Sequence, residues 1–271
     1  MNNRENDGLE ELDSLPNGVK LSWGLGKQPK RGPKGELSVE QIVEAAVAIA
    51  DREGLAAVSM SRVAGALGFT TMSLYRYLSS KEDLLVLMQD AASAVPIPPQ
   101  REEADWRDEM REYVRETIRV FREHPWYGDL PITGVPVTPN VLRFVEWGLR
   151  TMREFPLSDY EKMSIILLLS SYARSCGIIE QDLGRLVREG GDPDSFSGLS
   201  YTAALRRLVD ADRYPYLHPL VMSGVYTGEK EDENPVGDDM EFGLERILDG
   251  IQHYLDTKQG KEPAAEEEGG N

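Results

Sequence analysis

Cysteine is nearly absent from this chain, which has Cys176 as its single example. One cysteine excludes an internal disulfide framework and a cysteine-based zinc cluster, and it suits a reducing compartment. We interpret Cys176, in the middle of a helical stretch, as a small buried apolar group, with a redox-sensing thiol as the alternative. The three histidines lie far apart, without a pair at i, i+4. We therefore expect no metal site and no cofactor.

Long hydrophobic runs are also lacking. Apolar runs such as residues 165–169 are far shorter than the ~18–20 apolar residues of a bilayer-spanning helix. Residues 2–7 are polar, and this start does not resemble a signal peptide. We expect no membrane partner and a cytoplasmic location. Nucleophile elbows, phosphate loops and dinucleotide fingerprints do not occur in the sequence, so an enzyme is not expected.

Positive charge is scarce, because 30 lysine and arginine residues against 47 acidic residues give a formal net charge of −17. This average disfavours nucleic acid as a partner, but the charge is unevenly distributed. Residues 27–93 contain eight basic and eight acidic residues and so carry no net charge. Within them, residues 27–34 form a basic arm without an acidic residue. We interpret this arm either as a contact to phosphates or the minor groove, or as a solvated linker.

Helical periodicity extends over most of the chain, and the absence of strand alternation predicts an all-α fold. Residues 1–35 are expected to be a disordered acidic lead followed by the basic arm, with Trp23 as a candidate contact. Short helices are predicted within 36–95, a stiff proline-rich linker at 95–99, longer helices within 100–257 and a disordered tail at 258–271. The longer helices are expected over about 104–123, 138–155, 158–189, 199–210 and 237–257.

Helix starts are marked by three pairs with the spacing of a capping box. These are Ser38 with Gln41, Ser80 with Asp83, and Ser158 with Glu161. Thr138 followed by Pro139 is typical of an N-cap with proline at the first helical position.

Residues 59–77 have the pattern of a helix-turn-helix motif. A short helix carrying Val63 and Leu67 ends at Gly68, and a polar second helix over 70–77 follows. We expect Phe69 and Leu74 to pack this helix against its neighbours, leaving polar side chains for a major groove. The candidate DNA-binding residues are Ser59, Arg62, Thr70, Thr71, Met72, Ser73, Tyr75, Arg76, Tyr77 and Lys81.

Residues 38–90 resemble the DNA-binding domain of the TetR family of bacterial transcription factors. The likeness is carried by VSMSRVAGALGF at 58–69, LYRYL at 74–78 and KEDLL at 81–85. A weaker likeness, in HPW at 124–126 and FGLERILDG at 242–250, is to the ligand-sensing domain of the tetracycline-repressor branch.

The resemblance implies a three-helix DNA-binding domain over 36–95 and a helical effector-binding and dimerisation domain over 100–257. Helix 70–77 would be the recognition helix, with Thr71, Met72, Ser73 and Tyr77 facing bases and Ser59, Tyr75 and Lys81 contacting phosphates. The family forms homodimers on palindromic double-stranded DNA, and the helices near 158–190 and 237–257 would form the dimer interface.

The resemblance also implies a small-molecule effector bound in the helical domain. Candidate effector-binding residues are Trp106, Tyr113, Trp126, Phe144, Trp147, Met163 and Tyr172; for each of them, core packing is the alternative role. We therefore hypothesise a ligand-responsive repressor that an effector releases from DNA. The alternative is a ligand-binding or interaction protein of the same fold with little or no DNA binding, which the net charge of −17 motivates.

Overall fold

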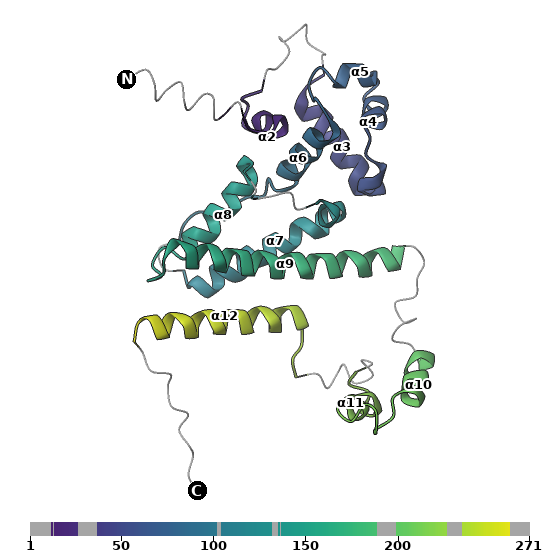
Figure 1. Cartoon of the computed structure of the whole chain (residues 1–271), viewed down its shortest axis with the longest axis vertical. Coiled ribbons are helices and arrows are strands. Elements are labelled where there is room, and N and C mark those ends of the chain that lie inside the picture. Colours follow the sequence, from purple (N-terminus) through teal and green to yellow (C-terminus); the bar gives the residue numbers. More distant parts are fainter. Residues whose placement is uncertain are drawn as a thin grey trace. The chain divides into compact units, whose positions relative to one another are not determined.

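A computed structural model describes residues 12, 14–26, 37–101, 104–131, 135, 137–188, 199–226 and 235–260. Every regular element in these ranges is a helix, which confirms the all-α prediction (Figure 1). The chain divides into two compact units, Met1–Ile178 and Ile179–Asn271. The proline-rich linker 95–99 lies inside the first unit, and the boundary between the units falls within a long helix, α9 (Asp159–Arg188). The basic arm 27–34 and the tail 261–271 lie outside the described residues.

The predicted DNA-binding segment folds as a group of short helices, which we call the head (residues 37–95). These helices are α3 (Val39–Glu53), the 3-10 turn η1 (Leu55–Ala57), α4 (Met60–Ala66), α5 (Thr71–Leu74) and α6 (Lys81–Ala92). The Ser38–Gln41 capping box is confirmed, because each side chain bonds the backbone amide of the other residue. The apolar side chains of these helices form a common core, in which Ile42, Val63, Leu74, Leu84 and Met88 are fully buried.

The expectation of a disordered lead is wrong for residues 14–26, which include the helix α2 (Asn17–Ser22). A six-residue helix is unstable in isolation, so its order depends on tertiary contacts. Those contacts are with α6, beside which α2 lies in Figure 1; Gly18 and Val19 are buried. The buried residues of α2 are only Gly18 and Val19, and two neighbouring positions do not produce a helical periodicity. The sequence pattern therefore does not predict this helix.

Three long helices and a 3-10 turn make up the rest of the first unit. They are α7 (Trp106–Glu123), η2 (Pro125–Asp129), α8 (Pro139–Thr151) and the first part of α9. The capping pair Ser158–Glu161 is confirmed at the start of α9. Gly148 and Gly177 permit close packing, because a Cβ atom would lie 2.2 Å from Ile166 Cδ1 at the first position and 2.5 Å from Phe121 Cβ at the second.

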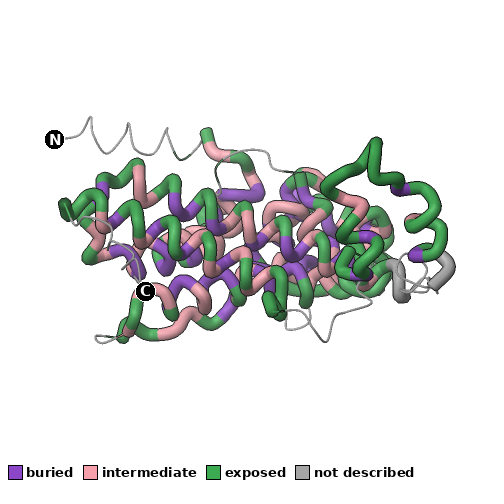
Figure 2. The backbone as a smooth tube through the Cα atoms, turned by 90° about the horizontal axis from the view of Figure 1, so that it is seen from below, coloured by how far each residue is buried: buried purple, intermediate pink, exposed green. Residues whose placement is uncertain are grey.

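The second unit contains the end of α9 together with α10 (Leu199–Leu208), α11 (Leu217–Ser223) and α12 (Asp239–Lys258). Helix α11 was not expected from the sequence. In α12, Leu244, Leu248, Ile251 and Leu255 are buried at spacings of three and four residues, which gives the helix one inner face. Figure 2 shows the same alternation of buried and exposed residues along the other long helices.

Helix α9 corrects the expectation that no segment could span a membrane. Within the described residues, 159–185 of this helix are long and apolar enough, with a mean hydropathy of 1.3 over the best window. Uninterrupted apolar runs in the sequence do not reveal this segment, because single polar residues divide it into shorter runs. Long core helices of soluble proteins have the same composition, and α9 packs on α7 through Gly177 and Phe121. We therefore treat α9 as a core helix, on which Leu167 and Leu168 are exposed in the part of the chain that the structure describes.

Candidate DNA-binding and effector sites

Helices α4 and α5 and the turn between them form the predicted helix-turn-helix. The Ser59 side chain accepts a hydrogen bond from the Arg62 amide and so caps α4. The turn requires a left-handed backbone at Gly68, whose φ is +75°, and this favours glycine. Leu74 is completely buried and holds α5 against the head.

The recognition helix is shorter than predicted. Regular α-helix covers only Thr71–Leu74, rather than 70–77. Beyond it the backbone tightens, because the Arg76 and Tyr77 amides bond carbonyls three residues back, those of Ser73 and Leu74. The tightening lets Leu78 return to the core, where it is 1% exposed.

The outer surface of this motif is uncovered by the described parts of the chain. Met72 is 72% exposed and Tyr75 is 48% exposed. Phe69 is 41% exposed, so the expectation that it would be buried beneath α5 is wrong, and Leu74 is the buried residue of this helix. Phe69 is therefore an additional candidate for contact with DNA. The sequence does not indicate this role, because an aromatic residue next to a turn is typical of a core position.

The ten candidate residues lie close together in the chain's fold, at the start of α4, along α5 with its following turn, and at the start of α6. Ser59, Arg62, Thr70, Met72, Tyr75 and Arg76 are exposed, whereas Thr71, Ser73, Tyr77 and Lys81 are half-buried. The Thr70 and Ser73 hydroxyls share a hydrogen bond of 3.0 Å, which orders the start of α5.

Arg62 is already engaged by a carboxylate. Its guanidinium bonds Glu53 at the end of α3, and Arg52 bonds the same carboxylate with an N–O distance of 2.8 Å. Hydrogen bonds from Arg52 and then Arg62 lower the pKa of Glu53 below its ordinary value. A phosphate approaching Arg62 must therefore compete with Glu53.

Polar contacts join the head to the following helices at two places. At the end of α3, Asp51 accepts hydrogen bonds from Trp126 Nε1 at 2.6 Å and pairs with His124 Nδ1 at 2.8 Å. At the end of α6, the Asp90 carboxylate accepts from the backbone amide of Asn140, at 2.8 Å, and from its side chain, at 3.0 Å. Asp90 thus occupies the amino end of α8, where negative charge is favourable.

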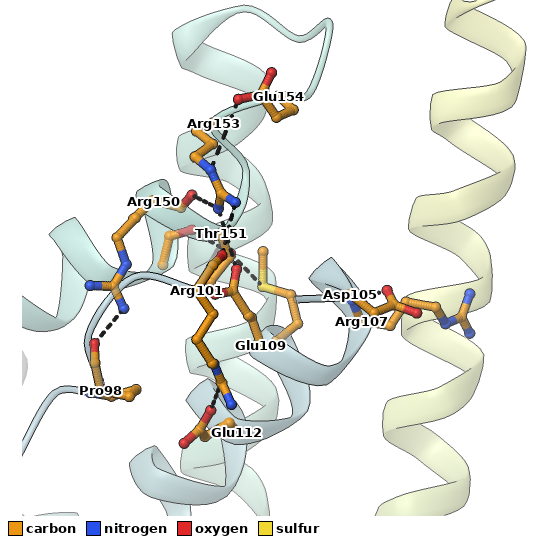
Figure 3. A network of polar contacts seen from close by, with 12 residues as sticks. Pro98, Arg101, Asp105, Arg107, Glu109, Glu112, Arg150, Thr151, Arg153 and Glu154 are labelled. Carbon is orange, nitrogen blue, oxygen red and sulfur yellow. Dashed lines mark hydrogen bonds and ion pairs between the residues drawn. The ribbon is translucent and has the colours of Figure 1, made fainter. Parts of the chain in front are cut away.

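Arginines contact the linker after α6 and the residues that follow it (Figure 3). Arg150 Nη2 donates to the carbonyl of Pro98 at 2.8 Å. Arg153 contacts the buried carboxylate of Glu109, and Arg101 pairs with Glu112 on α7. These contacts join the segment that follows α6 to α7 and α8.

Three of the predicted effector residues form an aromatic cluster. Tyr113 on α7 meets Phe144 and Trp147 on α8 edge to face, with ring centroids 6.2 and 5.6 Å apart. The Tyr113 hydroxyl is 3.2 Å from the Ser170 hydroxyl of α9. Burial raises the pKa of Tyr113, and the Ser170 hydrogen bond only partly opposes this.

The other four predicted effector residues lie elsewhere. Trp126 packs beside His124 and Tyr127 and belongs to the contact with Asp51. Trp106 meets Phe155 edge to face at 5.2 Å, Met163 is 44% exposed, and Tyr172 is half-buried. A surface hollow of about 450 Å³ beside the linker is lined by Arg101, Ala104, Asp105 and Asp108, none of which was predicted. Cys176 is buried, and the described residues contain no cluster of three potential metal ligands.

Comparison with known proteins places this geometry in a family. Residues 42–88 match the family described as bacterial regulatory proteins, tetR family, and residues 98–255 match the tetracyclin repressor-like C-terminal domain. The HTH-type transcriptional repressor DrrR1 of Streptomyces coeruleorubidus is 33% identical over 248 residues, which cover 90% of this chain and 87% of the relative.

Solved structures agree with this assignment. Apo ActR from Streptomyces coelicolor has a TM-score of 0.68 at 25% identity, covering 83% of this chain and 100% of that chain. ActR in complex with actinorhodin has a TM-score of 0.68 at 25% identity, covering 82% and 98%. The chain therefore belongs to the TetR family of bacterial regulatory proteins and is a DNA-binding transcriptional regulator.

Proposed function

We propose that this protein is a repressor that binds a palindromic operator as a homodimer and is released from it by a small-molecule effector. The observation that carries the proposal is the uncovered surface of α5, where Met72 and Tyr75 project beside exposed hydroxyl and guanidinium groups. The name of DrrR1 as a repressor and the complex of ActR with actinorhodin support the regulatory and ligand-binding parts.

The side chains on α5 are assigned to the major groove. Thr71, Met72, Ser73 and Tyr77 would face base edges, with Met72 suited to a thymine methyl group. Ser59, Tyr75 and Lys81 would contact phosphates, and Lys81 is the first residue of α6, where free backbone amides favour an anion. Arg62 would join them by exchanging Glu53 for a phosphate.

The homodimer would form through α9 and α12. On α9, Leu167 is 67% and Leu168 is 47% exposed, and on α12, Phe242 and Tyr254 are 44% and 40% exposed. These apolar side chains are available for a second copy of the chain. A dimer places two recognition helices on half-sites separated by about one or more helical turns, ~34 Å each.

The effector would bind near the aromatic cluster of Tyr113, Phe144 and Trp147. Displacing these rings would move α8, whose Asn140 contacts Asp90 of the head, and α7, which leads into η2 and its contact with Asp51. An effector can release DNA only by binding better to the released conformation than to the bound one. We expect the protein to act by binding alone, without catalysis, and to do so in the cytoplasm, at the nucleoid while bound.

Mobility-shift titration tests the proposal directly. DNA selected from a random pool with the purified protein, or the region upstream of its own gene, should bind tightly. The double variant Tyr75→Ala, Arg76→Ala should abolish this binding, whereas Tyr216→Ala, at a side chain 90% exposed and remote in sequence from α5, should bind like wild type. Binding by the double variant at the wild-type level would contradict the proposal.

The salt dependence of DNA binding distinguishes the proposed repressor from the alternative, a protein of this fold with little or no DNA binding. An operator-binding protein loses affinity steeply as salt rises, because each neutralised phosphate releases counterions. A protein of this fold that retains only ligand binding would bind DNA weakly and with a flat salt response, as its net charge of −17 would favour. Release of bound DNA by added actinorhodin would test the effector step.

A further inference from the structure

The segment 14–26, which we call the strap, packs on the head so closely that a glycine is required. A Cβ atom added to Gly18 would lie 2.9 Å from the Asp83 Cα atom, 3.0 Å from its carbonyl oxygen and 3.1 Å from Val86 Cβ. Two of these neighbours are backbone atoms of α6 and cannot move aside. The backbones of α2 and α6 are therefore in direct contact.

Polar groups fix the position of this contact. Asp83, which is 7% exposed, accepts hydrogen bonds from the Gly18 amide at 2.7 Å and from Asn17 Nδ2 at 2.8 Å. The same carboxylate accepts from the Ser79 amide at 2.9 Å. Asp83 therefore links the strap, the start of α6 and the segment that follows α5 (residues 75–79), which we call the recognition turn.

The other end of the strap contacts the effector domain. Trp23 Nε1 donates to the carbonyl oxygen of Val137 at 2.8 Å, just before the start of α8. The strap thus connects the first turn of α6 to the residues just before α8. It lies outside both segments that match the family, 42–88 and 98–255.

We infer that Asn17, Gly18 and Trp23 are positioning residues for operator binding. They hold the start of α6, and with it the recognition turn that ends at Ser79, in one orientation relative to α8. This inference rests on the proposed operator binding. With the strap released, the head samples additional orientations, so affinity for the correctly spaced operator falls and discrimination against incorrect spacing is reduced.

Two variants of the full-length protein test this inference, with Leu25→Ala as a matched control. Gly18→Leu introduces a side chain where α6 backbone lies, and Trp23→Phe removes only the indole N–H donor. Leu25 is in the same segment and is 53% exposed. In Gly18→Leu, hydrogen exchange should accelerate at the backbone amides of residue 18 and Ser79. In Leu25→Ala, exchange at both amides should remain as in wild type.

DNA titrations with the selected operator, and with the same operator carrying one extra base pair between half-sites, give the functional result. Loss of one hydrogen bond is worth ~2- to 12-fold in affinity, so we expect Trp23→Phe to weaken operator binding within this range. Its preference for the correct spacing should fall by a similar factor. A smaller folded fraction would lower both affinities equally and leave their ratio unchanged.

The outcomes are distinguishable. If wild-type protein binds no selected DNA, the proposed function fails, whatever the strap does. If wild type binds but Gly18→Leu, with accelerated exchange at Ser79, keeps its affinity and its spacing ratio, the positioning role is overturned. If exchange at Ser79 does not change in Gly18→Leu, the packing of the strap on α6 is itself overturned.

Discussion

The indole nitrogen of Trp126 donates a hydrogen bond to the carboxylate of Asp51 across 2.6 Å, which joins η2 to the last turn of α3. Trp126 is 1% exposed, so its N–H group depends on this acceptor. His124 approaches the same carboxylate oxygen at 2.8 Å. A buried side chain of the effector domain is therefore in direct contact with a helix of the head.

Asp51→Ala should destabilise the protein by about 1–3 kcal/mol, because it leaves the buried Trp126 N–H group without an acceptor. Asp51→Asn retains an acceptor oxygen and should recover most of the loss. Urea denaturation followed by circular dichroism measures both free energies of unfolding. Equal stability of the alanine variant and wild type would show that the contact adds nothing.

Glu53→Gln should strengthen operator binding, because it releases Arg62 from a carboxylate and leaves it for a phosphate. The salt dependence of binding should become steeper, since one more phosphate is neutralised. Fluorescence anisotropy at several salt concentrations measures both effects. Arg62→Gln combined with Glu53→Gln is the control, and it should lose the gain; an unchanged or weaker Glu53→Gln variant would remove Arg62 from the DNA contacts.

Tyr113 should make stability fall at high pH. Its pKa in the folded protein is raised by burial, so above the ordinary value of about 10 the unfolded chain loses its proton first. Ionisation therefore favours unfolding from about pH 10 upwards, until the folded-state pKa is passed. Tyr113→Phe should show a smaller loss of free energy of unfolding between pH 9 and 11 than wild type. Parallel pH profiles for the two proteins would contradict this.

Gly177→Ala should destabilise the packing of α9 on α7. The new Cβ atom would lie 2.5 Å from both Cβ and Cγ of Phe121, and overpacking of this kind costs about 1–3 kcal/mol. Gly65→Ala in α4 is the control, since nothing lies within 4 Å of its Cβ position and helix propensity favours alanine. Thermal unfolding should show a lower Tm for Gly177→Ala and not for Gly65→Ala. A Tm of Gly177→Ala equal to or above that of wild type would mean that α7 and α9 move apart at little cost in stability.

Leu167→Glu should convert the protein to monomers, because it places a charge on the exposed apolar side of α9. Operator affinity should fall with it, since one head contacts only one half-site. Sedimentation velocity measures the oligomeric state, and Tyr216→Glu, at a residue that is 90% exposed before α11, is the control. A Leu167→Glu variant that remains dimeric would place the dimer interface elsewhere.

The sequence by itself determined the elements whose cause is local. Ser38 and Gln41, and Ser158 and Glu161, are three residues apart, and each pair caps its helix as its spacing predicts. The turn of the helix-turn-helix is also a local feature. Gly68 adopts the left-handed backbone that the turn requires, and a glycine does so without help from distant residues. The periodicity of the long helices likewise depends only on neighbours three or four residues apart.

Tertiary structure decided everything that depends on residues distant in sequence. Helix α2 is ordered because Asp83, more than sixty residues away, accepts its hydrogen bonds. Regular α5 ends at Leu74, before Leu78 returns to the core, and Phe69 stays 41% exposed while Leu74 is buried. Trp126 binds Asp51 instead of joining the aromatic cluster, because the packing of η2 on α3 brings the two side chains together. Such pairings depend on shape and distance in the folded chain, which sequence spacing does not encode.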